Sequence, residues 1–96
     1  MAHKAPQKAK RDGNEPEIVE AFKAHGIDVE RADHPVDLLL GHRGITWLVE
    51  VKNGPKAPLT TAQAAFFGRW RGHAAVITSV DEAIAFAQAI KAGKTP

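Results

Sequence analysis

Hydrophobic and polar positions follow two periods along the chain, and the period changes at glycine and proline residues. Apolar residues at every third or fourth position predict helices, whereas short runs of Val, Ile, Leu and Trp predict strands. The predicted helices cover 14–25, about 12 residues from Thr60, and 79–92. The predicted strands cover 27–31, 36–40, 45–51 and 74–78. This order indicates an α/β domain whose sheet starts as an antiparallel meander and gains a later strand in parallel.

Turn and cap residues separate these elements. Pro16 suits the first turn of a helix, and Gly26 suits the residue after its end. The segment 41–44, Gly-His-Arg-Gly, predicts the turn of a hairpin. Residues 53–58 predict a loop, and 79–82 has the Ser-x-x-Glu form of a capping box.

Length and composition restrict the classes of protein to which this chain can belong. A chain of 96 residues is one small domain by the usual length prior. The absence of cysteine excludes disulfides and a cysteine-ligated zinc site. No apolar run approaches the roughly 18 residues of a membrane span, and the start lacks the apolar core of a signal peptide. We therefore expect a cytoplasmic protein without membrane contact.

The positive charge is concentrated at one end. Residues 1–11 carry a charge of +4 and no acid, whereas residues 12–96 carry −2. Residues 1–13 are polar and basic without periodicity, which predicts a disordered arm ahead of a domain over 14–92. A nucleic-acid partner must therefore be argued from the positions of the charges rather than from their sum.

Two predicted strands carry charged residues on a face that is otherwise apolar. Side chains alternate along a strand, so Glu50 and Lys52 share a face at roughly 6–7 Å. If the hairpin is centred within 41–44, Asp37 lies opposite Leu48, and Glu50 is its diagonal neighbour. Asp37, Glu50 and Lys52 are then expected to form one patch.

The predicted helix before these strands and the predicted helix after them each carry a polar residue on an otherwise apolar face. Glu15 lies at the centre of the apolar stripe of the first helix, and Gln63 lies in the middle of that of the second. Each polar residue alone has an ordinary explanation. A helix dipole favours Glu15, a turn accommodates Asp37, a surface ion pair joins Glu50 to Lys52, and nearby backbone satisfies Gln63.

Taken together, these residues suggest a catalytic site. Carboxylates on one small patch repel each other unless a cation neutralises them, and hard oxygen ligands suit Mg²⁺ or Mn²⁺ rather than zinc. A lysine beside such an ion can orient or deprotonate a water while the metal polarises a phosphoryl oxygen. The constellation therefore suits metal-assisted hydrolysis of phosphodiesters.

The same residues resemble the PD-(D/E)XK nuclease superfamily over roughly residues 11–90. The matching segments are Pro35-Val36-Asp37 and Glu50-Val51-Lys52, with Glu15 and Gln63 on the flanking helices. More narrowly, the chain resembles the stand-alone VRR-NUC nucleases, typical of phages, and archaeal Holliday-junction-resolvase-like proteins. One departure is that Val36 separates the proline from the aspartate, which are usually adjacent. Asp33 is the less favoured alternative aspartate because it precedes the apolar run.

The resemblance implies a restriction-endonuclease-like αβββαβ(α) core with a mixed four-stranded sheet flanked by helices. It implies Mg²⁺, with Mn²⁺ as substitute, held by Asp37, Glu50, the backbone carbonyl of Val51 and, through water, Glu15. It further implies that Lys52 assists the attacking water and that Gln63 positions the lysine or the water.

The implied function is a homodimeric, divalent-metal-dependent endonuclease selective for branched DNA such as junctions, flaps and forks. No organic cofactor is expected, and a phage-encoded protein would act in the host cytoplasm. The alternatives are a non-catalytic DNA-binding dimer that retains the fold and a purely structural α/β domain. Candidate phosphate contacts, each otherwise a solvated surface charge, are Lys10, Arg11, Arg43, Lys56, Arg69 and Arg71.

Overall fold

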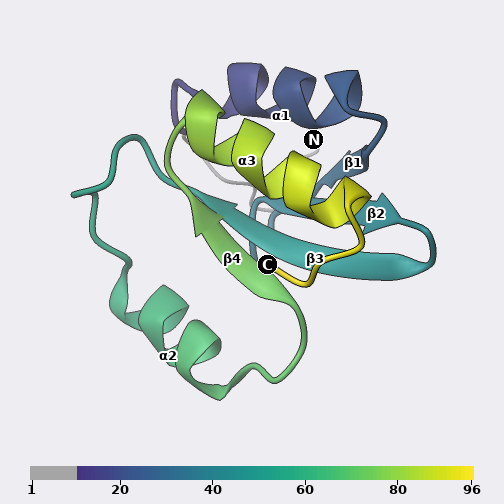
Figure 1. Cartoon of the computed structure of the whole chain (residues 1–96). Coiled ribbons are helices and arrows are strands. Elements are labelled where there is room, and N and C mark those ends of the chain that lie inside the picture. Colours follow the sequence, from purple (N-terminus) through teal and green to yellow (C-terminus); the bar gives the residue numbers. More distant parts are fainter. Residues whose placement is uncertain (1–10) are drawn as a thin grey trace, which may run out of the picture.

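A mixed four-stranded sheet in the order β1-β2-β3-β4 forms the centre of the protein (Figure 1). The computed structural model describes residues 11–96, so most of the predicted arm, Lys10 included, lies outside the described residues. The elements are α1 (Glu15–Ala24), β1 (Asp28–Arg31), β2 (Leu38–His42), β3 (Ile45–Val51), α2 (Thr61–Arg69), β4 (Ala74–Ile77) and α3 (Val80–Lys91). Strands β1 to β3 pair antiparallel and β4 joins β3 in parallel, which confirms the predicted meander with a later parallel strand.

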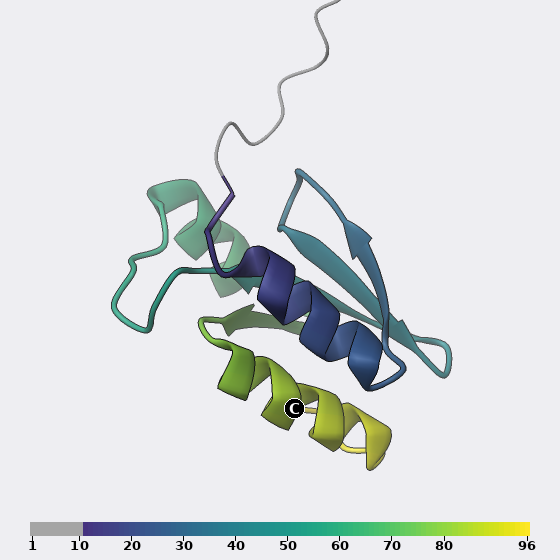
Figure 2. The ribbon, with the colours of Figure 1, turned by 90° about the horizontal axis from the view of Figure 1, so that it is seen from above.

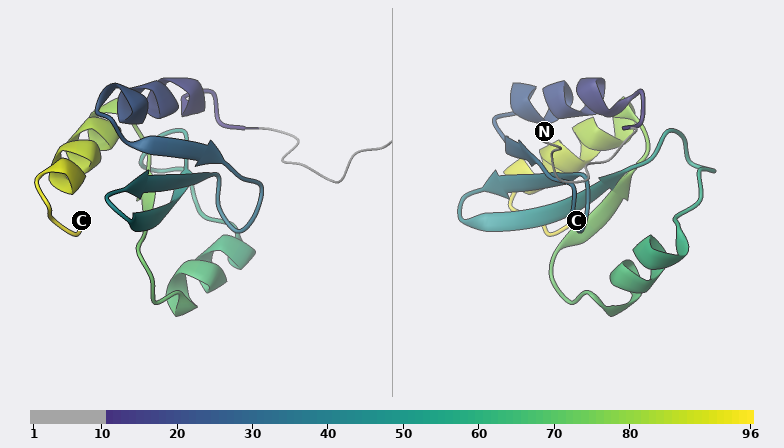
Figure 3. Two further views of the ribbon diagram at one scale, coloured as in Figure 1. Left: turned by 90° about the vertical axis from the view of Figure 1, so that its right-hand side faces the viewer. Right: turned by 180° about the vertical axis from the view of Figure 1, so that it is seen from behind.

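The helices form unequal layers on the two faces of the sheet. Helices α1 and α3 lie side by side on one face, and α2 lies alone on the other (Figures 1 and 2). The views from the side and from behind show the same separation (Figure 3). Helix α1 adopts this position because Ile18, Val19 and Phe22 form one apolar stripe, and all three are buried.

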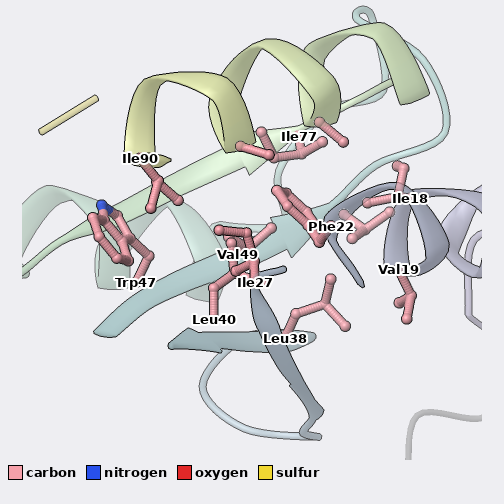
Figure 4. Close-up of a cluster of buried hydrophobic side chains, with 13 residues drawn as sticks. Ile18, Val19, Phe22, Ile27, Leu38, Leu40, Trp47, Val49, Ile77 and Ile90 are labelled. Carbon is pink, nitrogen blue, oxygen red and sulfur yellow. The ribbon is translucent and has the colours of Figure 1, made fainter. Parts of the chain in front are cut away.

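Strand β3 is buried on both faces, and its alternation decides which residue faces which layer. Trp47 and Val49 pack into the larger core below α1 and α3 (Figure 4). Leu48 packs with Phe66 in a smaller core below α2. Because side chains alternate along a strand, Glu50 shares the α2 face with Leu48. The sequence pattern predicted this division correctly.

The hairpin turn is shorter than predicted. Only Arg43 and Gly44 form it, with φ of 51° and 80°, and residues 41–42 belong to β2, which runs over Leu38–His42 rather than 36–40. Two consecutive residues of positive φ make a turn whose twist matches the flanking strands. Gly41, the first residue of the predicted turn, therefore lies in β2.

This shorter turn shifts the strand register by two residues. Leu48 lies opposite Leu39, and the expected pairing of Leu48 with Asp37 was wrong. One step beyond the last pair of the ladder, Asp37 reaches the level of Glu50 and becomes its direct rather than its diagonal neighbour.

Helix α2 is also shorter than the 12 residues expected. It has 9 residues and ends where Trp70 turns to an extended backbone, with ψ of 132°. The indole of Trp70 stacks on Phe66 at 5.2 Å between ring centroids. No helix within residues 11–96 is long and apolar enough to cross a membrane.

Candidate active site

The predicted site residues lie at the end of the β2–β3 hairpin that is remote from its turn. The start of α1 reaches this end because the side chain of Asn14 joins two strand ends. Its Nδ2 donates to the carbonyl of Lys52, after β3, and to that of Thr78, after β4, both at 3.1 Å. Glu15, the next residue, is thereby placed beside the strands.

Three carboxylates that the sequence placed on apolar faces are buried. The exposed fractions are 1% for Glu15, 4% for Asp37 and 2% for Glu50. Oδ2 of Asp37 accepts a hydrogen bond of 2.8 Å from the backbone N–H of Val51. Asp37 is therefore fixed to the backbone of β3 directly after Glu50.

Lys52 and Gln63 both approach Glu50, and they approach the same oxygen. Nζ of Lys52 lies 3.9 Å from Oε2 of Glu50, and Nε2 of Gln63 donates to that oxygen at 2.8 Å. Oε1 of Gln63 accepts from the N–H of Thr60 at 2.9 Å, while the Thr60 hydroxyl accepts from the N–H of Gln63. This capping box fixes the orientation of the Gln63 amide.

In the structure the side-chain partner of Gln63 is Glu50. The positioning of Lys52 or of a water by Gln63, which the resemblance implied, stays a prediction. Its amide holds the carboxylate of Glu50, on the oxygen that also faces Lys52. The Thr-x-x-Gln spacing at the start of α2 is itself a capping-box signature. This signal was present in the sequence and explains how a polar residue is held on an otherwise apolar helix face.

Arg11 is the central cation of the carboxylate cluster. Its guanidinium contacts three carboxylates and a carbonyl: Glu15 at 2.9 Å, Asp33 at 3.1 Å, Asp37 at 3.8 Å and the carbonyl of Ala32 at 2.9 Å. The same Oε2 of Glu15 lies 3.1 Å from Nε of Arg31. In the described part of the chain, two guanidinium groups therefore face three carboxylates.

The chemistry of the donors fits a hard divalent cation. Carboxylate oxygens and a backbone carbonyl are the ligands that Mg²⁺ prefers, and Asp37, Glu50, Glu15 and the carbonyl of Val51 supply that set. Among residues 11–96, Oε1 of Glu15 is buried and receives no hydrogen bond. In the same residues no three His, Cys, Asp or Glu side chains are close enough together to hold an ion, and a cationic side chain, Arg11, lies among the carboxylates instead.

The candidate phosphate contacts are dispersed. Arg43 sits in the hairpin turn, about 20 Å from Glu50 at the usual rise of a strand. Arg69 lines a groove of about 390 Å³ together with Gln63 and His34. The remaining candidates are exposed on the two connections of α2, Lys56 before it and Arg71 after it.

Sequence reasoning missed three residues that organise the site. Asn14 stands just before a helix, where a capping residue is expected, but its bonds go to two distant strand ends. Arg11 was assigned to a disordered arm and named only as a candidate phosphate contact, and Arg31 was assigned no role. Apart from the contact of Arg11 with Glu15, their partners lie 16 to 64 positions away, and local periodicity does not report contacts over such separations.

The fold defines an α/β domain of the restriction-endonuclease-like class. A solved structure described as a "VRR_NUC domain" is similar to this chain, with a TM-score of 0.65 and 24% identity. The match covers 76% of this chain and 88% of that one. No protein-family model matches the sequence, and a comparison with curated proteins gives no match. The chain therefore has the VRR-NUC fold, as the resemblance of its sequence implied.

Proposed function

We propose that this protein is a divalent-metal-dependent DNA endonuclease. The observation that supports this most is the meeting of Asp37, Glu50 and Lys52 at one strand end, on the fold of a VRR-NUC domain. Gln63, on α2, restrains Glu50 on the same face of the sheet, so the pair of Glu50 and Lys52 has a defined geometry. Defined positions are what a site needs to hold a reacting water in line with a phosphodiester.

The proposed roles follow from the contacts. Asp37, Glu50, the carbonyl of Val51 and Glu15 are the groups that would hold Mg²⁺. When bound, the ion supplies a Lewis acid that stabilises charge developing on the phosphoryl oxygens. The ammonium of Lys52 lies beside Glu50, at the edge of these proposed ligands. From there it would orient the attacking water and stabilise the charge of the phosphate.

The proposed substrate is branched DNA, and the proposed assembly is a homodimer. The resemblance to stand-alone VRR-NUC and junction-resolving nucleases supports both. Arg69 shares a groove with Gln63, which gives one phosphate contact next to the site. Two sites in a dimer would allow paired cuts on the two strands of a junction.

The test is cleavage of labelled four-way junctions, flaps, forks and linear duplex by the purified full chain, in Mg²⁺ and in EDTA. We expect Mg²⁺-dependent cleavage that favours branched substrates and disappears in Lys52→Gln. Lys91→Gln, which removes an equal charge from the exposed end of α3, serves as the matched control. Undiminished cleavage by Lys52→Gln contradicts the site assignment.

One observation favours the alternative, a DNA-binding protein that retains the fold without catalysis. Arg11 and Arg31 already neutralise Glu15, so the buried carboxylates do not require a metal for stability. Such a protein would bind junctions equally well with and without Mg²⁺, bind no Mn²⁺ in calorimetry and cleave nothing.

A further inference from the structure

The contacts of Arg11 are those of a cation within the candidate metal site. It reaches Glu15 and Asp37, two of the carboxylates that would hold the metal, and its side chain is only 28% exposed. It enters from the segment before α1, and Asp12 is the next residue, whose carbonyl accepts from the N–H of Glu15. The end of the arm is therefore anchored at the carboxylates by a charged side chain.

A guanidinium and a divalent ion bind carboxylate oxygens at different distances and in different geometries. The planar guanidinium spreads its donors: Nη1 lies 2.9 Å from Glu15 and 3.8 Å from Asp37, and Nη2 lies 3.1 Å from Asp33. Mg²⁺ requires oxygens at about 2.0–2.1 Å from a single centre. Both cannot occupy the space between Glu15 and Asp37, because the like charges also repel each other.

We propose that Arg11 is a built-in counter-cation that competes with the divalent metal for Glu15 and Asp37. This inference rests on the proposed function, and it adds a regulatory element to the same site. With Arg11 in place, the carboxylates are neutralised and the metal is excluded. When Arg11 withdraws, Glu15 and Asp37 become available as ligands, and the guanidinium becomes available to a phosphate.

The inference also connects Arg11 to the proposed substrate. The ten residues before Arg11 carry three lysines and no acid. A DNA phosphate that binds the guanidinium of Arg11 competes with the carboxylates for it. By linkage, DNA bound through Arg11 then raises the affinity of the site for metal, and metal raises the affinity for DNA by the same factor.

The test is Mn²⁺ binding to the full chain by calorimetry, for wild type, Arg11→Ala and the matched control Lys23→Ala. Lys23 carries the same charge on the same helix as Glu15 but is exposed in its last turn, about 12 Å further along the axis. We expect Arg11→Ala to lower the Kd about tenfold, because a unit charge beside the ion is removed. We expect Lys23→Ala to stay within about twofold of wild type, since exposed charges at that distance are screened.

Thermal melting separates this result from misfolding. Without metal, Arg11→Ala should melt below wild type, and it should gain more than wild type when Mn²⁺ is added. If Arg11→Ala does not fold, Arg11→Gln removes the charge but keeps an amide donor for the carbonyl of Ala32. A folded Arg11 variant that binds Mn²⁺ no more tightly than wild type overturns the inference alone. Absence of Mn²⁺ binding in all variants overturns the proposed metal site and the inference with it.

Discussion

Asp37 has both a structural partner and a proposed catalytic role, and two substitutions separate them. In Asp37→Ala the buried N–H of Val51 loses its acceptor at 2.8 Å. An unsatisfied buried donor costs about 1–3 kcal/mol. The lost ion pair with Arg11, at 3.8 Å and partly exposed, adds less than about 1 kcal/mol. We therefore expect a loss of about 2 kcal/mol in the free energy of unfolding, or about 8–16 °C in Tm for a domain of this size.

Asp37→Asn keeps an acceptor oxygen in the same position. Its side-chain carbonyl can receive the N–H of Val51, so we expect the free energy of unfolding to stay within about 1 kcal/mol of wild type. The negative charge is lost, however, so Mn²⁺ binding and cleavage should fall as in Asp37→Ala. Urea denaturation followed by circular dichroism, together with calorimetry, measures both properties. Equal destabilisation by the two substitutions refutes the assigned hydrogen bond, and full cleavage by Asp37→Asn refutes the assigned ligand.

Two other substitutions test the second helix layer and the core. Gln63→Leu removes the bond to buried Glu50, so cleavage should fall well below that of Thr60→Ala, which removes only the cap at a cost of about 1 kcal/mol. Equal cleavage rates in these two variants refute a role for the amide in holding Glu50. Phe22→Ala, at a fully buried position in edge contact with Phe86, should cost about 3–5 kcal/mol in urea denaturation, and a loss below about 1 kcal/mol contradicts the proposed core.

Periodicity was sufficient to predict the element order because each element buries one regular pattern. The strand with Trp47, Val49 and Glu50 shows this directly, since alternation assigned each side chain to the correct layer. The register was not predictable in the same way. A glycine at position 41 is typical of a turn as well as of a strand, and only the backbone angles of Arg43 and Gly44 decide between them.

The site was predictable to the extent that its residues break a pattern. Glu15 and Glu50 were found because a carboxylate on an apolar face is costly unless it is paired. Arg11 could not be found in this way. A cation in a polar segment breaks no pattern, and its contacts with Asp33 and Asp37 depend on how the chain folds back over more than twenty positions.

The proposed role of Arg11 links the stability of the protein to its proposed metal binding. Buried carboxylates of like charge destabilise the folded state unless a cation lies among them. In the absence of metal the guanidinium of Arg11 supplies this cation, with Glu15 and Asp37 facing its Nη1 and Asp33 facing its Nη2. A bound divalent ion would also neutralise these carboxylates, but only if they move together around one centre. Any change that strengthens the ion pairs between Arg11 and these carboxylates would therefore stabilise the metal-free protein. It would weaken metal binding by the same free energy. If the proposed metal site is correct, its affinity for metal would be set by the strength of an internal ion pair as well as by the ligands themselves.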